Sequence, residues 1–156
     1  MKLQGKTALI TGGGTGIGEG IARAFAAEGC RVGICGRREE VLQQAVSAWD
    51  GDPPFLSHTV DISSRESVNE LFDWAASELG PIDILVNSAG TNVKTRSMAE
   101  MTPDQWDKVM AINASGTYYC MHAVLPQMRE RGGGLIINIS SIAGKRSSPL
   151  GGVAYS

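Results

Sequence analysis

Residues that commonly bind metals or form disulfides are scarce in this sequence. Its 156 residues include only two histidines and three cysteines. Cys30, Cys35 and Cys120 are odd in number and lack C-x-x-C spacing, and His58 and His122 lie far apart in the chain. Such a set matches neither a zinc-site pattern nor a disulfide framework. We therefore expect no metal site, and reduced thiols in a cytoplasmic protein.

A large excess of charge and long apolar runs are absent as well. The 14 Lys and Arg residues nearly balance the 16 Asp and Glu residues, and the formal net charge is −2. This balance provides no attraction toward nucleic acid. No apolar run approaches the ~20 residues that cross a bilayer, and no apolar signal segment follows residues 1–6. We expect neither a nucleic-acid partner nor a membrane partner.

Glycine, in contrast, is abundant, with 20 residues, nearly twice the average usage of about 7%. Short apolar runs alternate with longer amphipathic stretches along the chain. The short runs, which predict strands, are residues 7–10, 31–35, 55–60, 82–86 and 135–140. The amphipathic stretches predict helices, the longest of which runs to Arg131 with a break near Asn113.

This alternation predicts the fold class. Strands that are apolar on both sides and separated by helices indicate a parallel sheet covered on both faces. We predict a single α/β dinucleotide-binding domain over residues 1–156, with a doubly wound parallel sheet of strand order 3-2-1-4-5. Its ligand crevice is expected at the carboxyl ends of the first and fourth strands.

Local signals predict how individual helices begin. Ser63 with Glu66, and Thr102 with Gln105, match the capping-box pattern. In the first predicted helix, Ile17, Ile21, Phe25 and Ala26 fall on one face.

A glycine-rich loop at residues 11–18 joins the first strand to the first helix. Glycine inside a helix costs about 1 kcal/mol relative to alanine, so Gly16 and Gly18 at a helix start suggest a backbone that approaches a ligand closely. The free N–H groups and the dipole of a helix N-terminus suit a pyrophosphate. A P-loop is disfavoured, because Glu19 and Gly20 stand where Lys and Ser or Thr are required. The structural alternative is a flexible turn.

The pattern Gly12-x-x-x-Gly16-x-Gly18 resembles the short-chain dehydrogenase/reductase family, whose fold is of the Rossmann type, and the resemblance covers the whole chain. The other signatures of that family follow in order, namely Asn87-Ser88-Ala89-Gly90 after the fourth strand, Asn113, Ser141 and Tyr155. Ser88 departs from the family, which more often has a second Asn at this position.

The resemblance implies an oxidoreductase that transfers hydride between a nicotinamide cofactor and a ketone or secondary alcohol. The implied catalytic residues are Asn113, Ser141 and Tyr155. The implied cofactor-binding residues are Gly12, Gly14, Thr15, Gly16, Ile17, Gly18, Arg37, Arg38, Asp61, Ile62, Asn87, Ala89 and Gly90, with Asp61 and Ile62 beside the adenine. Each has an ordinary structural alternative, such as helix capping for Asp61. The alternative function is a non-catalytic dinucleotide-binding sensor or scaffold.

The end of the second strand predicts which dinucleotide binds. An acidic residue there selects NAD, whereas an arginine accommodates the 2′-phosphate of NADP. Arg37 and Arg38 follow the strand, with no acid at the turn, which favours NADP over NAD. The relatives that prefer NADP often carry a second basic residue where this chain has Thr15. Solvated arginines paired with Glu39 or Glu40 are the alternative.

By the same resemblance, Tyr155 is the acid/base, Ser141 hydrogen-bonds the carbonyl oxygen, and Asn113 steadies, through water, a lysine four residues after the tyrosine. A phenol has a pKa near ~10, which such a positive charge lowers for work at neutral pH. The sequence stops at Ser156, before that lysine and before the C-terminal strands. We expect the N-terminal part of a longer enzyme, inactive by itself.

Self-association is the last expectation. Apolar residues of the long helix, including Tyr118, Leu125 and Met128, cover more of its circumference than one core-facing stripe needs. In the family that this chain resembles, the helix commonly packs against its own copy about a two-fold axis. We expect the full-length protein to be a homodimer or a homotetramer.

Overall fold

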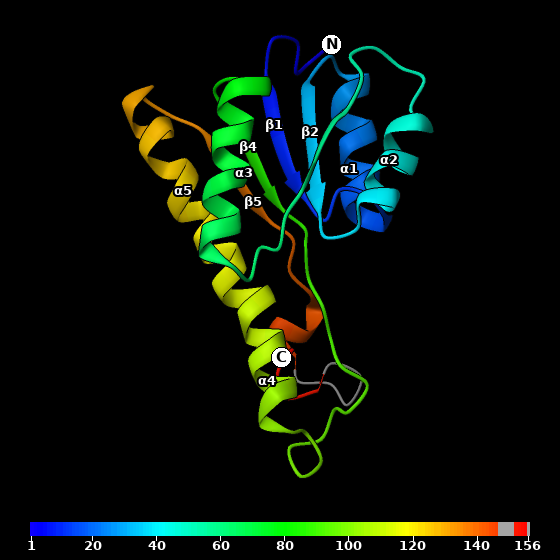
Figure 1. Cartoon of the computed structure of the whole chain (residues 1–156), viewed down its shortest axis with the longest axis vertical. Coiled ribbons are helices and arrows are strands. Elements are labelled where there is room, and N and C mark those ends of the chain that lie inside the picture. The colour runs from blue at the N-terminus through cyan, green and yellow to red at the C-terminus, as the bar shows by residue number, and fades with distance from the viewer. Residues whose placement is uncertain (147–151, 156) are drawn as a thin grey trace.

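The computed structural model describes residues 1–146 and 152–155 and contains a five-stranded parallel sheet (Figure 1). Its strands are β1 (Thr7–Thr11), β2 (Arg31–Gly36), β3 (Leu56–Thr59), β4 (Ile84–Asn87) and β5 (Leu135–Asn138). Their order is β3-β2-β1-β4-β5, which confirms the predicted order. Residues 147–151 and Ser156, where the expectation about the end of the chain falls, lie outside the described residues.

Helices cover both faces of this sheet. Helices α1 (Gly16–Ala27) and α2 (Glu39–Ser47) lie on one face, and α3 (Arg65–Glu78) and α5 (Thr117–Glu130) lie on the other (Figure 1). Alternate residues of β1 explain the arrangement, since Ala8 and Ile10 pack with α1 and α2, whereas Leu9 packs with α3 and α5. No helix within the described residues is both long enough and apolar enough to cross a bilayer.

The long helical stretch changes its hydrogen bonding part-way along. Helix α4 (Pro103–Met110) leads into a π-helical segment, η1 (Ala111–Gly116), and then into α5. The predicted break near Asn113 is therefore confirmed as a π-helix, a form that is frequent at functional sites. Thr102 and Gln105 form the predicted capping box at the start of α4.

One local prediction is wrong. Helix α3 is capped by Ser64, whose side chain accepts a hydrogen bond from the Ser67 N–H, whereas the predicted cap, Ser63, hydrogen-bonds to Asp61. Ile17 is 66% exposed and does not pack in the core. Its position explains this, because the first turn of α1 lies at the open end of the sheet and borders the cavity described below.

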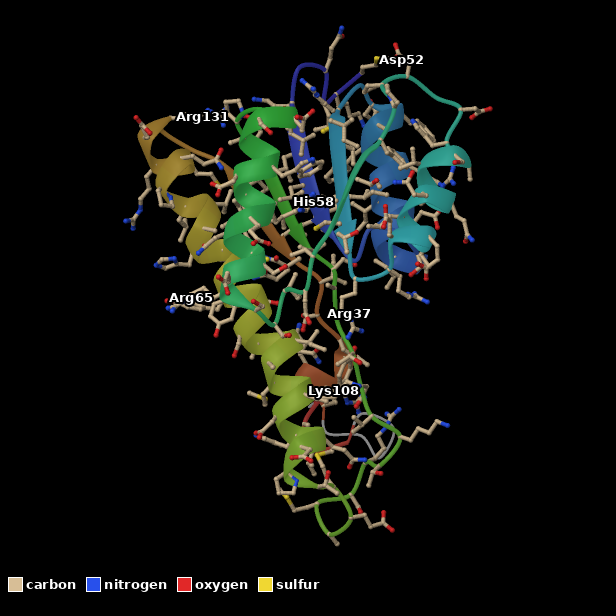
Figure 2. The ribbon with its side chains drawn as sticks, viewed as in Figure 1. Arg37, Asp52, His58, Arg65, Lys108 and Arg131 are labelled. Atoms are coloured by element: carbon tan, nitrogen blue, oxygen red, sulfur yellow. The ribbon has the colours of Figure 1, made fainter. Side chains whose placement is uncertain are left out.

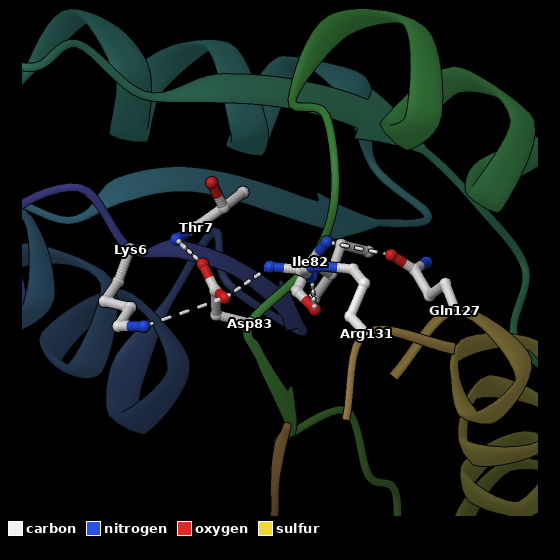
Figure 3. Close-up of polar contacts among 6 residues, drawn as sticks. All are labelled: Lys6, Thr7, Ile82, Asp83, Gln127 and Arg131. Carbon is white, nitrogen blue, oxygen red and sulfur yellow. Dashed lines mark hydrogen bonds and ion pairs between the residues drawn. The ribbon is translucent and has the colours of Figure 1, made fainter. Parts of the chain in front are cut away.

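At the amino end of the strands, Asp83 ties β1 and β4 to the end of α5 (Figure 3). Its carboxylate accepts hydrogen bonds from the Thr7 N–H at 2.9 Å and from the Arg131 guanidinium at 2.8 Å, and the Lys6 ammonium lies 3.9 Å away. Arg131 also donates to the Ile82 carbonyl oxygen at 3.2 Å. Burial raises the pKa of Asp83, but these hydrogen bonds and charges outweigh it and lower the pKa below its ordinary value of 3.8.

We expect Asp83→Asn to lower the free energy of unfolding at pH 7 by about 1–3 kcal/mol, because hydrogen bonds to a charged group contribute about that much. A carboxyl whose pKa is lower in the folded state stabilises the fold above its unfolded-state pKa, and this stabilisation is lost as pH falls through the folded-state pKa. The difference between the two proteins should therefore shrink below about pH 4. Urea unfolding at pH 7 and about pH 3 measures it, and a pH-independent difference would contradict the charge-based explanation.

Candidate functional site

A cavity of about 740 Å³ opens at the carboxyl ends of the strands, the end toward which the strand arrows point in Figure 1. All the residues predicted to bind the cofactor or to act in catalysis line it. The structure thus brings together distant parts of the chain, namely the glycine loop, the segments that follow β2, β3, β4 and β5, the π-helix η1, and the segment around Tyr155. The described residues contain no group of three or more His, Cys, Asp or Glu side chains placed to hold a metal ion.

The glycine loop forms a cradle in which a side chain at Gly12 or Gly18 would collide with neighbouring backbone. Gly12 has a φ of +66°, and a Cβ there would lie 2.9 Å from the backbone of Ala89. A Cβ on Gly18 would collide with the carbonyl oxygen of Gly12. The Gly12 N–H donates to the Cys35 carbonyl oxygen at 2.8 Å, which holds the turn against β2. The turn is therefore close-packed at Gly12 and Gly18, where a side chain would displace neighbouring backbone atoms.

The start of α1 offers its N–H groups to the cavity. Its N-cap residue, Thr15, makes no side-chain capping hydrogen bond, whereas α3 and α4 are capped by Ser64 and Thr102. The first N–H groups of a helix need partners, and the dipole favours an anion there. An uncapped helix start behind a glycine cradle fits the pyrophosphate of a dinucleotide.

Thr11 supports the site without lining the cavity, and the sequence prediction left it out although it stands directly before Gly12 in the glycine loop. Its hydroxyl oxygen accepts hydrogen bonds from the N–H groups of Ser88 and Ala89, both at 3.1 Å. It therefore fixes the segment after β4 next to the glycine loop. A polar residue at the end of an apolar strand is the signal that would have indicated this role.

Asn87 and Asn138 form a polar pair at the ends of β4 and β5. The Asn87 amide nitrogen donates to Asn138 Oδ1 at 2.8 Å. Asn87 Oδ1 is buried and has no hydrogen-bond partner within the described part of the chain. A buried acceptor without a partner carries a free-energy penalty of about 1–3 kcal/mol, so its position on the cavity wall suits a donor from a bound ligand. Asn138 was missed because its partner lies in another strand.

The segments after β2 and β3 bring Arg37, Arg38 and Asp61 to one end of the cavity. Within residues 1–146 and 152–155, neither arginine forms an ion pair, so the alternative pairing with Glu39 or Glu40 is not formed. Asp61 does not cap α3, and its Oδ1 instead accepts hydrogen bonds from the Ser63 hydroxyl at 2.6 Å and the Ser63 N–H at 3.0 Å.

Asn113, Ser141 and Tyr155 line the cavity beyond the glycine loop. The Asn113 side chain is engaged with the backbone of Thr91, accepting from its N–H and donating to its carbonyl oxygen, both at 2.8 Å. It holds the loop after β4 against the π-helix. Ser141 Oγ accepts from the Ala143 N–H at 3.2 Å, which leaves its hydroxyl hydrogen available to a ligand. Tyr155 is 36% exposed.

The parallel sheet, its helices on both faces and the crevice at the strand ends define a doubly wound α/β domain of the Rossmann type. A family model described as short chain dehydrogenase matches residues 6–156. The chain belongs to this family, as the sequence resemblance implied.

Individual relatives agree with this assignment. An uncharacterized oxidoreductase of Staphylococcus aureus strain MW2 is 38% identical over 142 residues, which are 91% of this chain and 61% of the relative. A short-chain type dehydrogenase/reductase from Mycobacterium ulcerans is 29% identical, with a TM-score of 0.90 over 99% of this chain and 57% of that protein. A serine dehydrogenase from Escherichia coli is 34% identical, with a TM-score of 0.83 over 91% of this chain and 65% of that one. This chain spans about three fifths of their length.

Proposed function

We propose that the intact protein is an NADP(H)-dependent oxidoreductase that interconverts a ketone and a secondary alcohol. The observation that carries the proposal is one cavity lined by the glycine cradle, by Arg37 after β2, and by Ser141 and Tyr155. When bound, the nicotinamide cofactor supplies or accepts the hydride. The chain's own residues bind the cofactor, orient the carbonyl and move the proton.

Different parts of the cavity are proposed to bind different parts of the cofactor. The cradle at Gly12 and Gly18 and the uncapped start of α1 bind the pyrophosphate. Arg37, which forms no ion pair with the described residues, binds the 2′-phosphate, since a guanidinium pairs well with phosphate. The unpartnered Asn87 Oδ1 accepts a hydroxyl donor of the cofactor.

Proton transfer takes place in the part of the cavity lined by Tyr155 and Ser141. Tyr155 Oη donates a proton to the carbonyl oxygen as hydride reaches the carbon, and it takes the proton back during alcohol oxidation. The Ser141 hydroxyl donates a hydrogen bond to the same oxygen. Asn113 acts as a positioning residue, because its amide is held by the backbone of Thr91.

We also propose a cytoplasmic location and self-association for the full-length protein. The three cysteines are buried and unpaired, which is in keeping with a reducing cytoplasm. On α5, Met128 and Val124 are buried, but Tyr118 is 56% and Leu125 is 39% exposed. These exposed residues are the surface through which we propose that the full-length protein forms a homodimer or homotetramer.

Oxidation of NADPH by the intact protein, followed by absorbance with a panel of ketones and aldehydes, tests the proposed function. Turnover with at least one carbonyl compound is expected. Binding of NADPH without turnover across the panel would instead favour the sensor or scaffold function.

The cofactor preference leads to a specific prediction at Arg37. Arg37→Asp should weaken NADPH binding about ten- to hundredfold, because a charged hydrogen-bond partner contributes about 1.5–3 kcal/mol, and should affect NADH much less. Fluorescence titration with both cofactors measures this. Arg65→Asp is the control, since Arg65 lies away from the cavity at the start of α3 (Figure 2). Equal affinities of the unmodified protein for NADPH and NADH would contradict the assignment.

A further inference from the structure

The pairing of β2 with β3 brings the negatively charged Asp61 to the same edge of the sheet as Arg37. Gly36 pairs with Thr59, and the Val60 N–H donates to the Gly36 carbonyl oxygen at 2.9 Å. Arg37 therefore follows the paired end of β2 directly, and Asp61 lies two residues after the paired end of β3. Both line the cavity, and Figure 2 shows Arg37 at this end of the sheet.

The Asp61 carboxylate is held in place. Its Oδ1 accepts two hydrogen bonds from Ser63, and its own N–H donates to Ser67 Oγ at 3.2 Å. The hydrogen bond from the Ser63 hydroxyl is the main cause that lowers the pKa of Asp61, burial opposes it, and the Ser63 N–H and the Arg37 charge lower it further. The carboxylate is thus charged at neutral pH and interacts electrostatically with Arg37.

Arg37 nevertheless keeps its donors available. Over residues 1–146 and 152–155, the structure contains no ion pair between Arg37 and Asp61 within 4.0 Å. The Asp61 carboxylate is fixed near Arg37 but forms no ion pair with it. It therefore repels a 2′-phosphate that binds at Arg37. A neutral ribose hydroxyl meets no such repulsion.

We propose that Asp61 sets the strength of the preference for a 2′-phosphate by offsetting the charge of Arg37. The inference rests on the proposed NADP site. Asp61, in the segment after β3, is thus a specificity-determining residue in addition to Arg37 after β2. Because of Asp61, the site accepts the unphosphorylated cofactor more readily than its two arginines alone imply.

Adenine nucleotide fragments test this without any turnover. The probes are 2′,5′-ADP, which carries the 2′-phosphate, and 5′-AMP, which lacks it. In the intact protein, Asp61→Asn should tighten 2′,5′-ADP relative to 5′-AMP about three- to tenfold, as expected for removal of one nearby charge close to the surface. Loss of an adenine contact would weaken both probes equally, so the ratio of their affinities isolates the charge effect.

A double-mutant cycle then separates repulsion of the 2′-phosphate by Asp61 from the attraction by Arg37. In an Arg37→Ala background, Asp61→Asn should still raise the ratio, because the repulsion between the carboxylate and the phosphate does not depend on the arginine. The gain should also fall in about 1 M salt, where the Debye length is about 3 Å. Asp52→Asn is the matched control, because Asp52 is exposed at the far end of the molecule from Arg37 (Figure 2), and it should leave the ratio unchanged.

The outcomes separate the two levels of the proposal. If the unmodified protein binds neither fragment, the proposed dinucleotide site is wrong and this inference fails with it. If both fragments bind but Asp61→Asn leaves their ratio unchanged, the dinucleotide site stands and the role of Asp61 is refuted. A gain in the ratio that disappears in the Arg37→Ala background overturns direct repulsion between the Asp61 carboxylate and the 2′-phosphate.

Discussion

Tyr155→Phe is expected to reduce kcat of the intact protein by about 10²- to 10⁴-fold, the contribution typical of a positioned general acid. The substitution removes only the hydroxyl, and the ring still borders the cavity. NADPH binding should therefore stay within about twofold of the unmodified value, because the cradle and the start of α1 are untouched. Steady-state rates of NADPH oxidation and fluorescence titration measure the two quantities separately.

The control for this prediction is Tyr118→Phe, which makes the same chemical change on the exposed surface of α5, outside the cavity. It should leave kcat unchanged. If Tyr155→Phe retains more than about a tenth of the activity, the assignment of the general acid is wrong.

Gly18→Ala is expected to destabilise the protein and to impair dinucleotide binding together. The new Cβ would collide with the Gly12 carbonyl oxygen and lie 3.2 Å from the Gly13 Cα. Overpacking of a close-packed site costs about 1–3 kcal/mol. The backbone of the glycine loop must also shift to make room for the new Cβ, which displaces the cradle. We expect the free energy of unfolding to fall by about 1–3 kcal/mol. We also expect NADPH to bind at least about tenfold more weakly.

Helix α1 contains the matched control for this experiment. Gly20 lies two residues further along the same helix and is exposed, and a Cβ at this position would meet no atom of another element within 4 Å. Gly20→Ala should stabilise the helix by up to about 1 kcal/mol and leave NADPH binding unchanged. Equal effects of the two substitutions would refute the cradle geometry.

The architecture was predictable because it depends on patterns within short stretches. The unbroken apolar residues of β1 indicated a strand buried on both faces, and Ala8, Leu9 and Ile10 do alternate between the two cores. The capping box at Thr102 was equally local. The cap of α3 was missed by one residue, because Ser63 and Ser64 carry the same side chain and only the interaction of Ser63 with Asp61 separates them.

The functions of single site residues were less predictable, because they depend on partners that lie far away in the sequence. The expected role of Asn113 did not include its contact with the backbone of Thr91, 22 residues earlier, which holds the amide in place. Thr11 orders Ser88 and Ala89, more than 70 residues later. No periodicity or motif spacing encodes such contacts.

The sequence by itself determined the fold class, the strand order and many of the residues that border the cavity, since hydrophobic periodicity and glycine spacing are properties of the chain. Only the tertiary structure decided what these residues contact. It left Arg37 without an ion pair among the described residues, placed the Asp61 carboxylate beside it, and left Asn87 Oδ1 buried without a described partner. The physical reason is that charge and hydrogen-bond interactions act over a few ångströms, and the parallel crossovers of the sheet decide which distant residues come that close.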